Sequence, residues 1–126
     1  MNIPQNLYYT KEHEWLRLEA DNTAFIGITD YAQKELGDIV YIEIETVGQT
    51  LAQNEVFGTV EAVKTVSDLY LPVSAEILSF NTELNSTPDK VNNDAYGEGW
   101  LVKVRVTNTD ELNALMKSEQ YSALVG

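Results

Sequence analysis

The chain contains no cysteine and only one histidine, His13, among its 126 residues. Disulfides, cysteine metal sites and thiol nucleophiles are therefore excluded, and one histidine leaves a metal centre short of ligands. Basic residues are also scarce. The chain has 8 of them against 20 acidic residues, which gives a formal net charge of −12. Such a charge repels nucleic-acid phosphates and favours basic protein partners. We expect no metal site and no nucleic-acid binding.

Long apolar runs are absent too, and none approaches the roughly 20 residues of a membrane helix. Residues 1–6 lack the basic start and apolar stretch of a secretory signal, and they do not resemble a transit peptide. We therefore expect no membrane association. The expected location is the bacterial cytoplasm, or the mitochondrial matrix only if a transit peptide has been removed. The length predicts a single domain over residues 1–126, expected to be a monomer.

Short β-rich segments, separated by turn signals, recur along the chain. Strands are predicted at Leu7–Tyr9, Trp15–Glu19, Thr23–Ile28, Ile39–Ile44, Val56–Val60, Val66–Leu71, Ser74–Phe80 and Trp100–Val106. Asp21-Asn22 predicts a hairpin turn. This pattern indicates a mainly β (α+β) fold, a small barrel or sandwich.

Helical signals are few. Thr29 or Asp30 is expected to cap a short helix near residues 30–36 that Gly37 ends. A C-terminal helical segment is predicted at about 109–125, with Ser118 capping its second part. The polar stretch 81–93 is predicted to be a long surface connection. Gly97 and Gly99 are expected to allow close packing beside Trp100.

The stretch Val60–Asp68 attracts attention because a lysine, Lys64, occupies the predicted hairpin tip. The simplest interpretation is a solvated surface lysine. However, hairpin tips normally use Gly, Asn, Asp or Pro, and none of these lies between Val60 and Val66. An exposed Val63 beside the lysine adds nothing to solubility. With Glu61 and Asp68 as flanking carboxylates, Lys64 is a candidate attachment point for a chemical group.

Two other candidate sites have weaker support. His13 lies between Glu12 and Glu14 and could act as a general base, but no serine or threonine has the setting of a nucleophile. The alternative is a histidine that is exposed or bonded to the backbone at a strand entrance. Segment 89–94 is rich in oxygen ligands but lacks the glycine and glutamate of a calcium loop.

Several stretches together resemble the H protein of the glycine cleavage system, in the order and spacing of that family. The matching segments are Tyr9–Trp15, Gly27–Gln33, Leu36–Val40, Glu61–Asp68, Pro72–Ser74 and Tyr96–Trp100. The resemblance implies a lipoyl/biotinyl-type barrel-sandwich hybrid of two small antiparallel sheets, with a core at about 23–106. The chain departs from the family pattern at Ala75, Lys90 and Ala95.

The resemblance implies that Lys64 carries lipoate in amide linkage, attached by a lipoate ligase or lipoyl transferase. The protein would then be a non-catalytic shuttle of glycine catabolism and one-carbon metabolism. It would carry an aminomethyl group from glycine decarboxylase (P protein) to aminomethyltransferase (T protein), and its dihydrolipoyl arm to dihydrolipoyl dehydrogenase (L protein). Glu14 and Asp68, with Glu12 nearby and Glu61 beside the lysine, match positions expected to meet the loaded arm.

Four alternatives compete with this interpretation. The first is a carrier that relays lipoyl groups to 2-oxoacid dehydrogenase complexes. A biotinyl carrier is the second, although its lysine usually follows a methionine, where this chain has Val63. The third, a small hydrolase using His13 and Glu14, fails because the chain shows no nucleophile. A β-domain that binds partners without a cofactor is the fourth.

Overall fold

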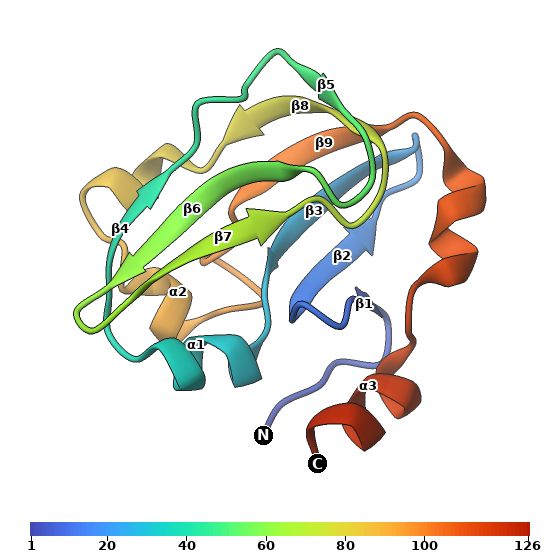
Figure 1. Cartoon of the computed structure of the whole chain (residues 1–126). Helices are drawn as coiled ribbons and strands as arrows, with labels where there is room; N and C mark the ends of the chain where they lie inside the picture. The colour runs from blue at the N-terminus through green and yellow to red at the C-terminus, as the bar shows by residue number, and fades with distance from the viewer.

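The computed structural model describes all residues, 1–126, and it consists of two antiparallel β-sheets bordered by short helices (Figure 1). The larger sheet has six strands in the spatial order β1 (Tyr8–Tyr9), β2 (Glu14–Leu18), β3 (Thr23–Ile28), β9 (Val102–Val106), β8 (Ala75–Phe80) and β5 (Thr50–Leu51). The smaller sheet has three strands in the order β4 (Ile39–Glu43), β6 (Val56–Ala62) and β7 (Val66–Tyr70). The helices are α1 (Asp30–Leu36), α2 (Lys90–Asn93) and α3 (Ser118–Val125), with 3₁₀ turns at Thr82–Asn85 and Thr109–Ala114. The predicted mainly β fold with two small sheets is confirmed.

Helix α1 begins and ends at the residues that the sequence indicates. The hydroxyl of Thr29 accepts a hydrogen bond from the backbone N–H of Ala32 at 3.2 Å, which is the N-cap contact. Gly37 follows the helix at φ +81°, a left-handed conformation that glycine adopts without a steric penalty, and its N–H donates to the carbonyl of Gln33. The β2–β3 hairpin likewise turns at Asn22, at φ +64°.

An apolar core of 21 buried residues fills the space between the two sheets. Strand β9 contributes Val102, Val104 and Val106 to this core, while Arg105 is exposed, as the alternating sequence predicts. A smaller cluster of Leu7, Tyr9, Trp15 and Tyr121 packs α3 against β1. The rings of Tyr9 and Tyr121 stack at a centroid distance of 4.7 Å. Both chain ends therefore lie near each other, at the bottom of Figure 1.

Gly27 allows the largest side chain of the smaller cluster to pack on β3. It is paired with Trp15 across the β2–β3 ladder, and a β-carbon placed on Gly27 would lie 2.7 Å from the indole ring. The indole N–H of Trp15 donates to the carbonyl of Ala95 at 3.0 Å, in a fully buried position. Only a glycine leaves room for this ring against the strand.

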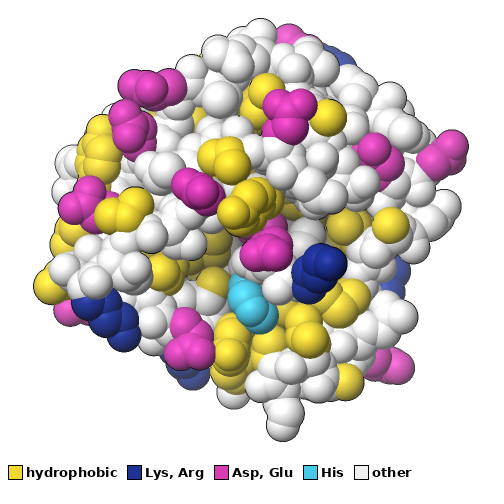
Figure 2. Space-filling model, in the orientation of Figure 1, with side chains coloured by type: hydrophobic (Ala, Val, Ile, Leu, Met, Phe, Trp, Pro, Cys, Tyr) yellow, Lys and Arg dark blue, Asp and Glu magenta, His cyan; other side chains and the backbone are white.

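Acidic side chains are spread over the molecular face in Figure 2, with fewer basic ones among them, as the net charge of −12 implies. The three α-helices have at most 8 residues. None of them has the length and apolar character needed to cross a bilayer.

The prediction of a long surface connection over residues 81–93 is wrong in part, because the segment also contributes to the core. This segment contains the 3₁₀ turn Thr82–Asn85 and helix α2, and it places Leu84 and Val91 in the main core. Each helix is only 4 residues long, so no helical periodicity is visible among the Asn, Ser, Thr and Asp residues around them. The side chain of Asn92 also binds the α1–β4 junction, where its amide group contacts the carbonyl of Gly37 and the N–H of Ile39.

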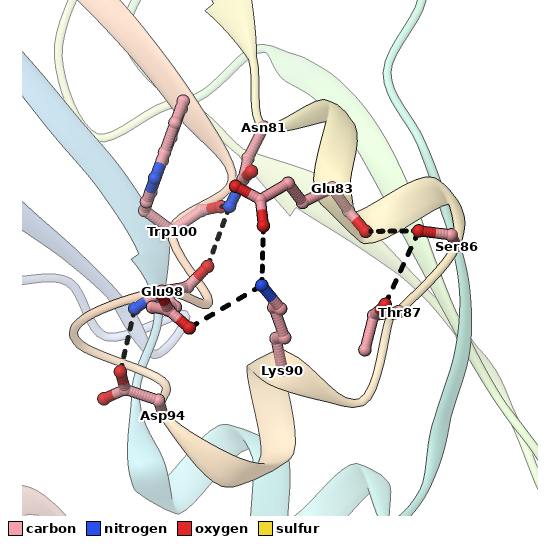
Figure 3. Close-up of polar contacts among 8 residues, drawn as sticks. All are labelled: Asn81, Glu83, Ser86, Thr87, Lys90, Asp94, Glu98 and Trp100. Atoms are coloured by element: carbon pink, nitrogen blue, oxygen red, sulfur yellow. Dashed lines mark hydrogen bonds and ion pairs between the residues drawn. The ribbon is translucent and has the colours of Figure 1, made fainter.

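A polar network holds this segment against the residues that precede β9 (Figure 3). The ammonium of Lys90 lies 2.7 Å from Glu83 and 3.6 Å from Glu98. The amide nitrogen of Asn81 donates to the carbonyls of Glu98 and Trp100 at 2.8 and 2.9 Å. Lys90 is thus paired with two carboxylates.

Two further details differ from the sequence predictions, and a third concerns a departure from the family pattern. A β-carbon on Gly97 would contact the carboxylate of Asp94, so this glycine allows close packing against that residue rather than beside Trp100. The N-cap position of α3 is Lys117 rather than Ser118, and its N–H is satisfied by the side-chain oxygen of Gln120 at 3.0 Å. Ala75 begins β8, outside the left-handed region, so the position needs no glycine.

Candidate functional site

Lys64 lies at the tip of the β6–β7 hairpin, as predicted. The strands pair up to Glu61 and Val66, and the carbonyl of Thr65 accepts a hydrogen bond from the N–H of Ala62 at 2.8 Å. No residue of the tip has a positive φ. The turn therefore needs neither glycine nor asparagine, which explains how Val63, Lys64 and Thr65 can form it.

The hairpin tip is fixed at its base, and its side chains are in solvent. The N–H of Val63 donates to the carbonyl of Asp38 at 3.1 Å, which ties the tip to the start of β4. Val63 is 76% exposed and Val66 is 62% exposed. Two β-branched apolar side chains in water beside a lysine cost solubility without stabilising the fold, so they favour contact with another molecule.

Lys64 itself is exposed and takes part in no ion pair or hydrogen bond of the structure. Its aliphatic stem passes over the end of α1, where a β-carbon on Gly37 would lie 3.6 Å from Cε of the lysine. An unpaired primary amine on a rigid tip is open to acylation by another enzyme. Lys11 is the other exposed lysine without an ion pair or an aromatic partner.

A cleft of about 300 Å³ opens between α1, the start of β2 and strand β7. Four carboxylates line it, from Glu12, Glu14, Glu35 and Asp68, and no lysine or arginine does. Apolar walls come from Ile28, Ala32, Leu36, Val60 and Leu69. Figure 2 shows the single histidine, in cyan, beside acidic and apolar side chains on this face. A cleft with acidic and apolar walls suits a ligand that combines a hydrocarbon chain with a cationic group.

The stem of Lys64 lies beside the end of α1, next to a residue of the cleft wall. Leu36, which precedes Gly37, forms part of this wall, and so does Asp68 on β7. Asp68 is four residues from Lys64 along the chain, which corresponds to about 13 Å at 3.3 Å per residue. A long flexible group attached to Lys64 could therefore fold back along β7 into the cleft.

Glu14 is the buried carboxylate of the cleft, with only 2% of its surface exposed. Its Oε1 accepts from the hydroxyl of Thr10 at 2.8 Å, and its Oε2 accepts from the N–H of Tyr70 at 3.0 Å. Because Tyr70 ends β7, this carboxylate connects the two sheets. Burial raises the pKa of Glu14 to about 7, although both hydrogen bonds oppose the shift.

His13 also lines the cleft, and it is neither fully exposed nor bonded to the backbone through its ring. His13 ends a turn that its N–H closes on the carbonyl of Thr10, and it has a φ of +70°. Its imidazole lies against α1, with a centroid distance of 4.7 Å to the ring of Tyr31. Nδ1 lies 2.8 Å from the hydroxyl of Tyr121. Burial lowers the pKa of His13, while the nearby carboxylates of Glu12 and Glu35 act in the opposite direction.

The structure therefore brings together three of the four carboxylates singled out in the sequence. Glu12, Glu14 and Asp68 line one cleft, although they are separated by up to 56 residues along the chain between β2 and β7. Glu61 is exposed on β6, opposite Val66, and lies outside the cleft lining. It flanks the lysine without facing the cleft.

Tyr31, Tyr121 and Thr29 are parts of this site that the sequence did not indicate as such. Tyr121 is 108 residues from His13, and no local pattern connects the two. Thr29 was expected only as a helix cap, but its hydroxyl also lies 2.7 Å from that of Tyr121. Only the packing of α3 on β1 makes the contact possible.

Comparison with known proteins gives one consistent result. The model of the family described as "Glycine cleavage H-protein" matches residues 7–126. The chain is 55% identical to the glycine cleavage system H protein of Bacteroides fragilis over 125 residues, 99% of this chain and 98% of the relative. It is 54% identical, with the same coverage, to that of Bacteroides thetaiotaomicron. The crystal structure of the H protein from Mycobacterium marinum superposes with a TM-score of 0.88 at 36% identity, covering 96% of this chain and 97% of the other.

Proposed function

The chain belongs to the glycine cleavage H-protein family, the lipoylated shuttles of the glycine cleavage system, and we propose that Lys64 is the residue that carries the lipoyl group. The observation that carries this proposal is the hairpin tip. It presents an unpaired lysine between exposed valines on a backbone held by Asp38. The carrier lysine must be reachable by an attaching enzyme and by several partners in turn, and this position meets that requirement.

The lipoyl group supplies a redox-active dithiolane that accepts the aminomethyl unit, and the chain supplies its attachment and position. Tethering replaces free diffusion by a local concentration on the order of millimolar. Acylation of Lys64 also removes one positive charge and makes the surface more acidic than −12. An acidic carrier is steered toward basic surfaces of its partners, and salt weakens that attraction.

The cleft is proposed to hold the amine of the loaded arm. Asp68 lies along its wall, Glu12 lies at its rim and Glu14 is buried inside it. A cationic amine between these carboxylates forms charge-assisted hydrogen bonds, and its charge also favours ionised Glu14. Apolar residues of α1 and β6 cover the hydrocarbon part of the arm. Glu61, outside the cleft, is proposed to contact the attaching enzyme.

The proposed partners are the P, T and L proteins of the glycine cleavage system, together with a lipoate ligase or lipoyl transferase. The chain itself is proposed to be non-catalytic and monomeric, and to act in the bacterial cytoplasm, in keeping with its bacterial relatives. We propose that residues 1–126 form one carrier domain with a core at about 23–106 and a helical segment at about 109–125. Two strands precede that core: β2 pairs with β3, and β1 pairs with β2, all in the same sheet.

Intact-mass measurement tests the attachment. The untagged protein, produced in cells with active lipoylation, is expected to gain the mass of one lipoyl amide. Lys64→Arg should lose that mass completely, because arginine keeps the charge but cannot form the amide. Lys11→Arg is the matched control, since Lys11 is also exposed and unpaired, and it should be lipoylated like the wild type. An unmodified wild type, or a lipoylated Lys64→Arg, would refute the assignment.

A further inference from the structure

Helix α3 reaches the cleft wall through a single residue that does not itself line the cleft. Tyr121 is fully buried, and its ring is fixed by stacking on Tyr9. Its hydroxyl lies 2.8 Å from Nδ1 of His13 and 2.7 Å from Oγ1 of Thr29. Thr29 caps α1, and His13 lines the cleft. One hydroxyl group thus joins the C-terminal helix, the N-terminus of α1 and the cleft.

The hydrogens of this chain of contacts can be placed by counting donors and acceptors. Thr29 is fully buried, so the hydrogen of its hydroxyl needs an acceptor inside the protein. Its other partner, the N–H of Ala32, is a donor, and the oxygen of Tyr121 is the acceptor within reach. The hydrogen of Tyr121 is then directed to His13. Nδ1 of His13 must accept it, so the neutral imidazole carries its hydrogen on Nε2.

Protonation of His13 would disturb this arrangement. Two links join Thr29, Tyr121 and His13, and the neutral state fills them with two hydrogens. A hydrogen on Nδ1 would be a third, and one donor would lose its acceptor in a site where Thr29 and Tyr121 are fully buried. Buried donors without an acceptor are unfavourable, so the contacts resist protonation.

We propose that Tyr121 is a positioning residue, which holds His13 as the neutral imidazole with its Nε2–H directed to the cleft. The ring is held from its other side by Tyr31, whose hydroxyl donates to Glu35. The charged groups around it on the cleft are Glu12, Glu14, Glu35 and Asp68. A neutral His13 leaves these carboxylates without a competing cation. The cleft then keeps its preference for the amine of the loaded arm. This last step depends on the proposed function.

Nitrogen NMR of the untagged protein tests the inference without any lipoylation. The chain has one histidine, so a long-range ¹H–¹⁵N correlation reports His13 alone. At pH 8 the wild type should show Nδ1 at the shift of an unprotonated ring nitrogen and Nε2 at that of a protonated one. Tyr121→Phe keeps the ring that stacks on Tyr9 but removes the hydroxyl. Its two nitrogen shifts should move toward each other, as both tautomers become populated.

Two matched pairs separate the hydrogen-bond role from a general loss of structure. Thr29→Ser keeps the donor and should keep the wild-type shifts, whereas Thr29→Val should resemble Tyr121→Phe. Tyr41→Phe, at an exposed position of β4, should leave both nitrogens unchanged. A wild-type Nδ1 that carries the hydrogen would overturn the inference, and so would unchanged shifts in both Tyr121→Phe and Thr29→Val.

The consequence for the arm has its own readout. Methylamine loss from the loaded lipoyl arm, followed by mass, should be faster in Tyr121→Phe than in Tyr41→Phe. Equal rates in the presence of a changed tautomer would show that His13 does not affect the held amine. Failure of the proposed function would be visible separately, as an absent lipoyl mass on Lys64, and would leave the nitrogen shifts unaffected.

Discussion

Replacing Glu14 by glutamine is expected to remove a large part of the pH dependence of folding stability. Glu14 is 2% exposed and bridges the two sheets through Thr10 and Tyr70. Glutamine has the same shape, so its oxygen can still accept from Tyr70. It has no charge at any pH, however. The variant therefore separates the cost of burying a carboxylate from the value of its hydrogen bonds.

The size of the effect follows from the shift in pKa. Burial raises the pKa of Glu14 from 4.5 to about 7. Between these values the folded state holds a proton that the unfolded chain has released, so stability falls as the pH rises through this window. At about 1.4 kcal/mol per unit the full step is about 3.5 kcal/mol, of which roughly 2.5 kcal/mol lies between pH 5 and pH 8. Above pH 8 the term is constant.

Urea unfolding, followed by the fluorescence of the two tryptophans, Trp15 and Trp100, measures this step. The free energy of unfolding of Glu14→Gln minus that of the wild type should rise by roughly 2.5 kcal/mol from pH 5 to pH 8, at constant m-value. Glu43→Gln, an exposed carboxylate on β4, is the control for the general loss of one charge. If Glu14→Gln and the wild type change in parallel, within about 0.7 kcal/mol across that range, the burial argument is wrong.

Two other substitutions test the packing and the cleft. Gly27→Ala should cost about 1–3 kcal/mol of unfolding free energy, because the new β-carbon would lie 2.7 Å from the ring of Trp15. Urea unfolding measures this cost. Gly48→Ala is not a suitable control, because Gly48 has a positive φ. A cost below about 0.5 kcal/mol would contradict the close contact. Glu14→Ala should leave Lys64 lipoylated but let the loaded arm lose methylamine faster, as followed by mass. Equal rates of loss in Glu14→Ala and the wild type would remove Glu14 from the amine site.

Local signals in the sequence were sufficient for most elements. Thr29 and Gly37 mark the two ends of α1, because a cap and a left-handed residue act within one helical turn. The alternation of Val102, Val104 and Val106 identified β9 and its buried face. The hairpin tip at Lys64 was found because two β-rich runs flank it, and its residues, which are unusual for a turn, marked it as a candidate site. Such features depend on neighbours along the chain, so they can be read without the fold.

The segment 81–93 shows where this type of reasoning fails. Its helices have one turn each, and their stability comes from burying Leu84 and Val91 rather than from any intrinsic helical preference. Asn92 accepts a hydrogen bond from the N–H of Ile39 at the α1–β4 junction, although the two residues are 53 positions apart in the sequence. Contacts of this kind leave no periodic trace in the sequence.

The sequence by itself determined the family resemblance, the mainly β fold, the short helix before Gly37 and the exposed position of Lys64. Only the tertiary structure decided that Glu12, Glu14 and Asp68 share one cleft, because the distance between them depends on how two sheets pack. It also decided that Glu14 is buried and that Tyr121 contacts His13. The physical reason is that turns, caps and strand faces are set by local backbone and solvent preferences. Burial, pKa and the placement of hydrogens depend instead on groups that meet only when the whole chain has folded.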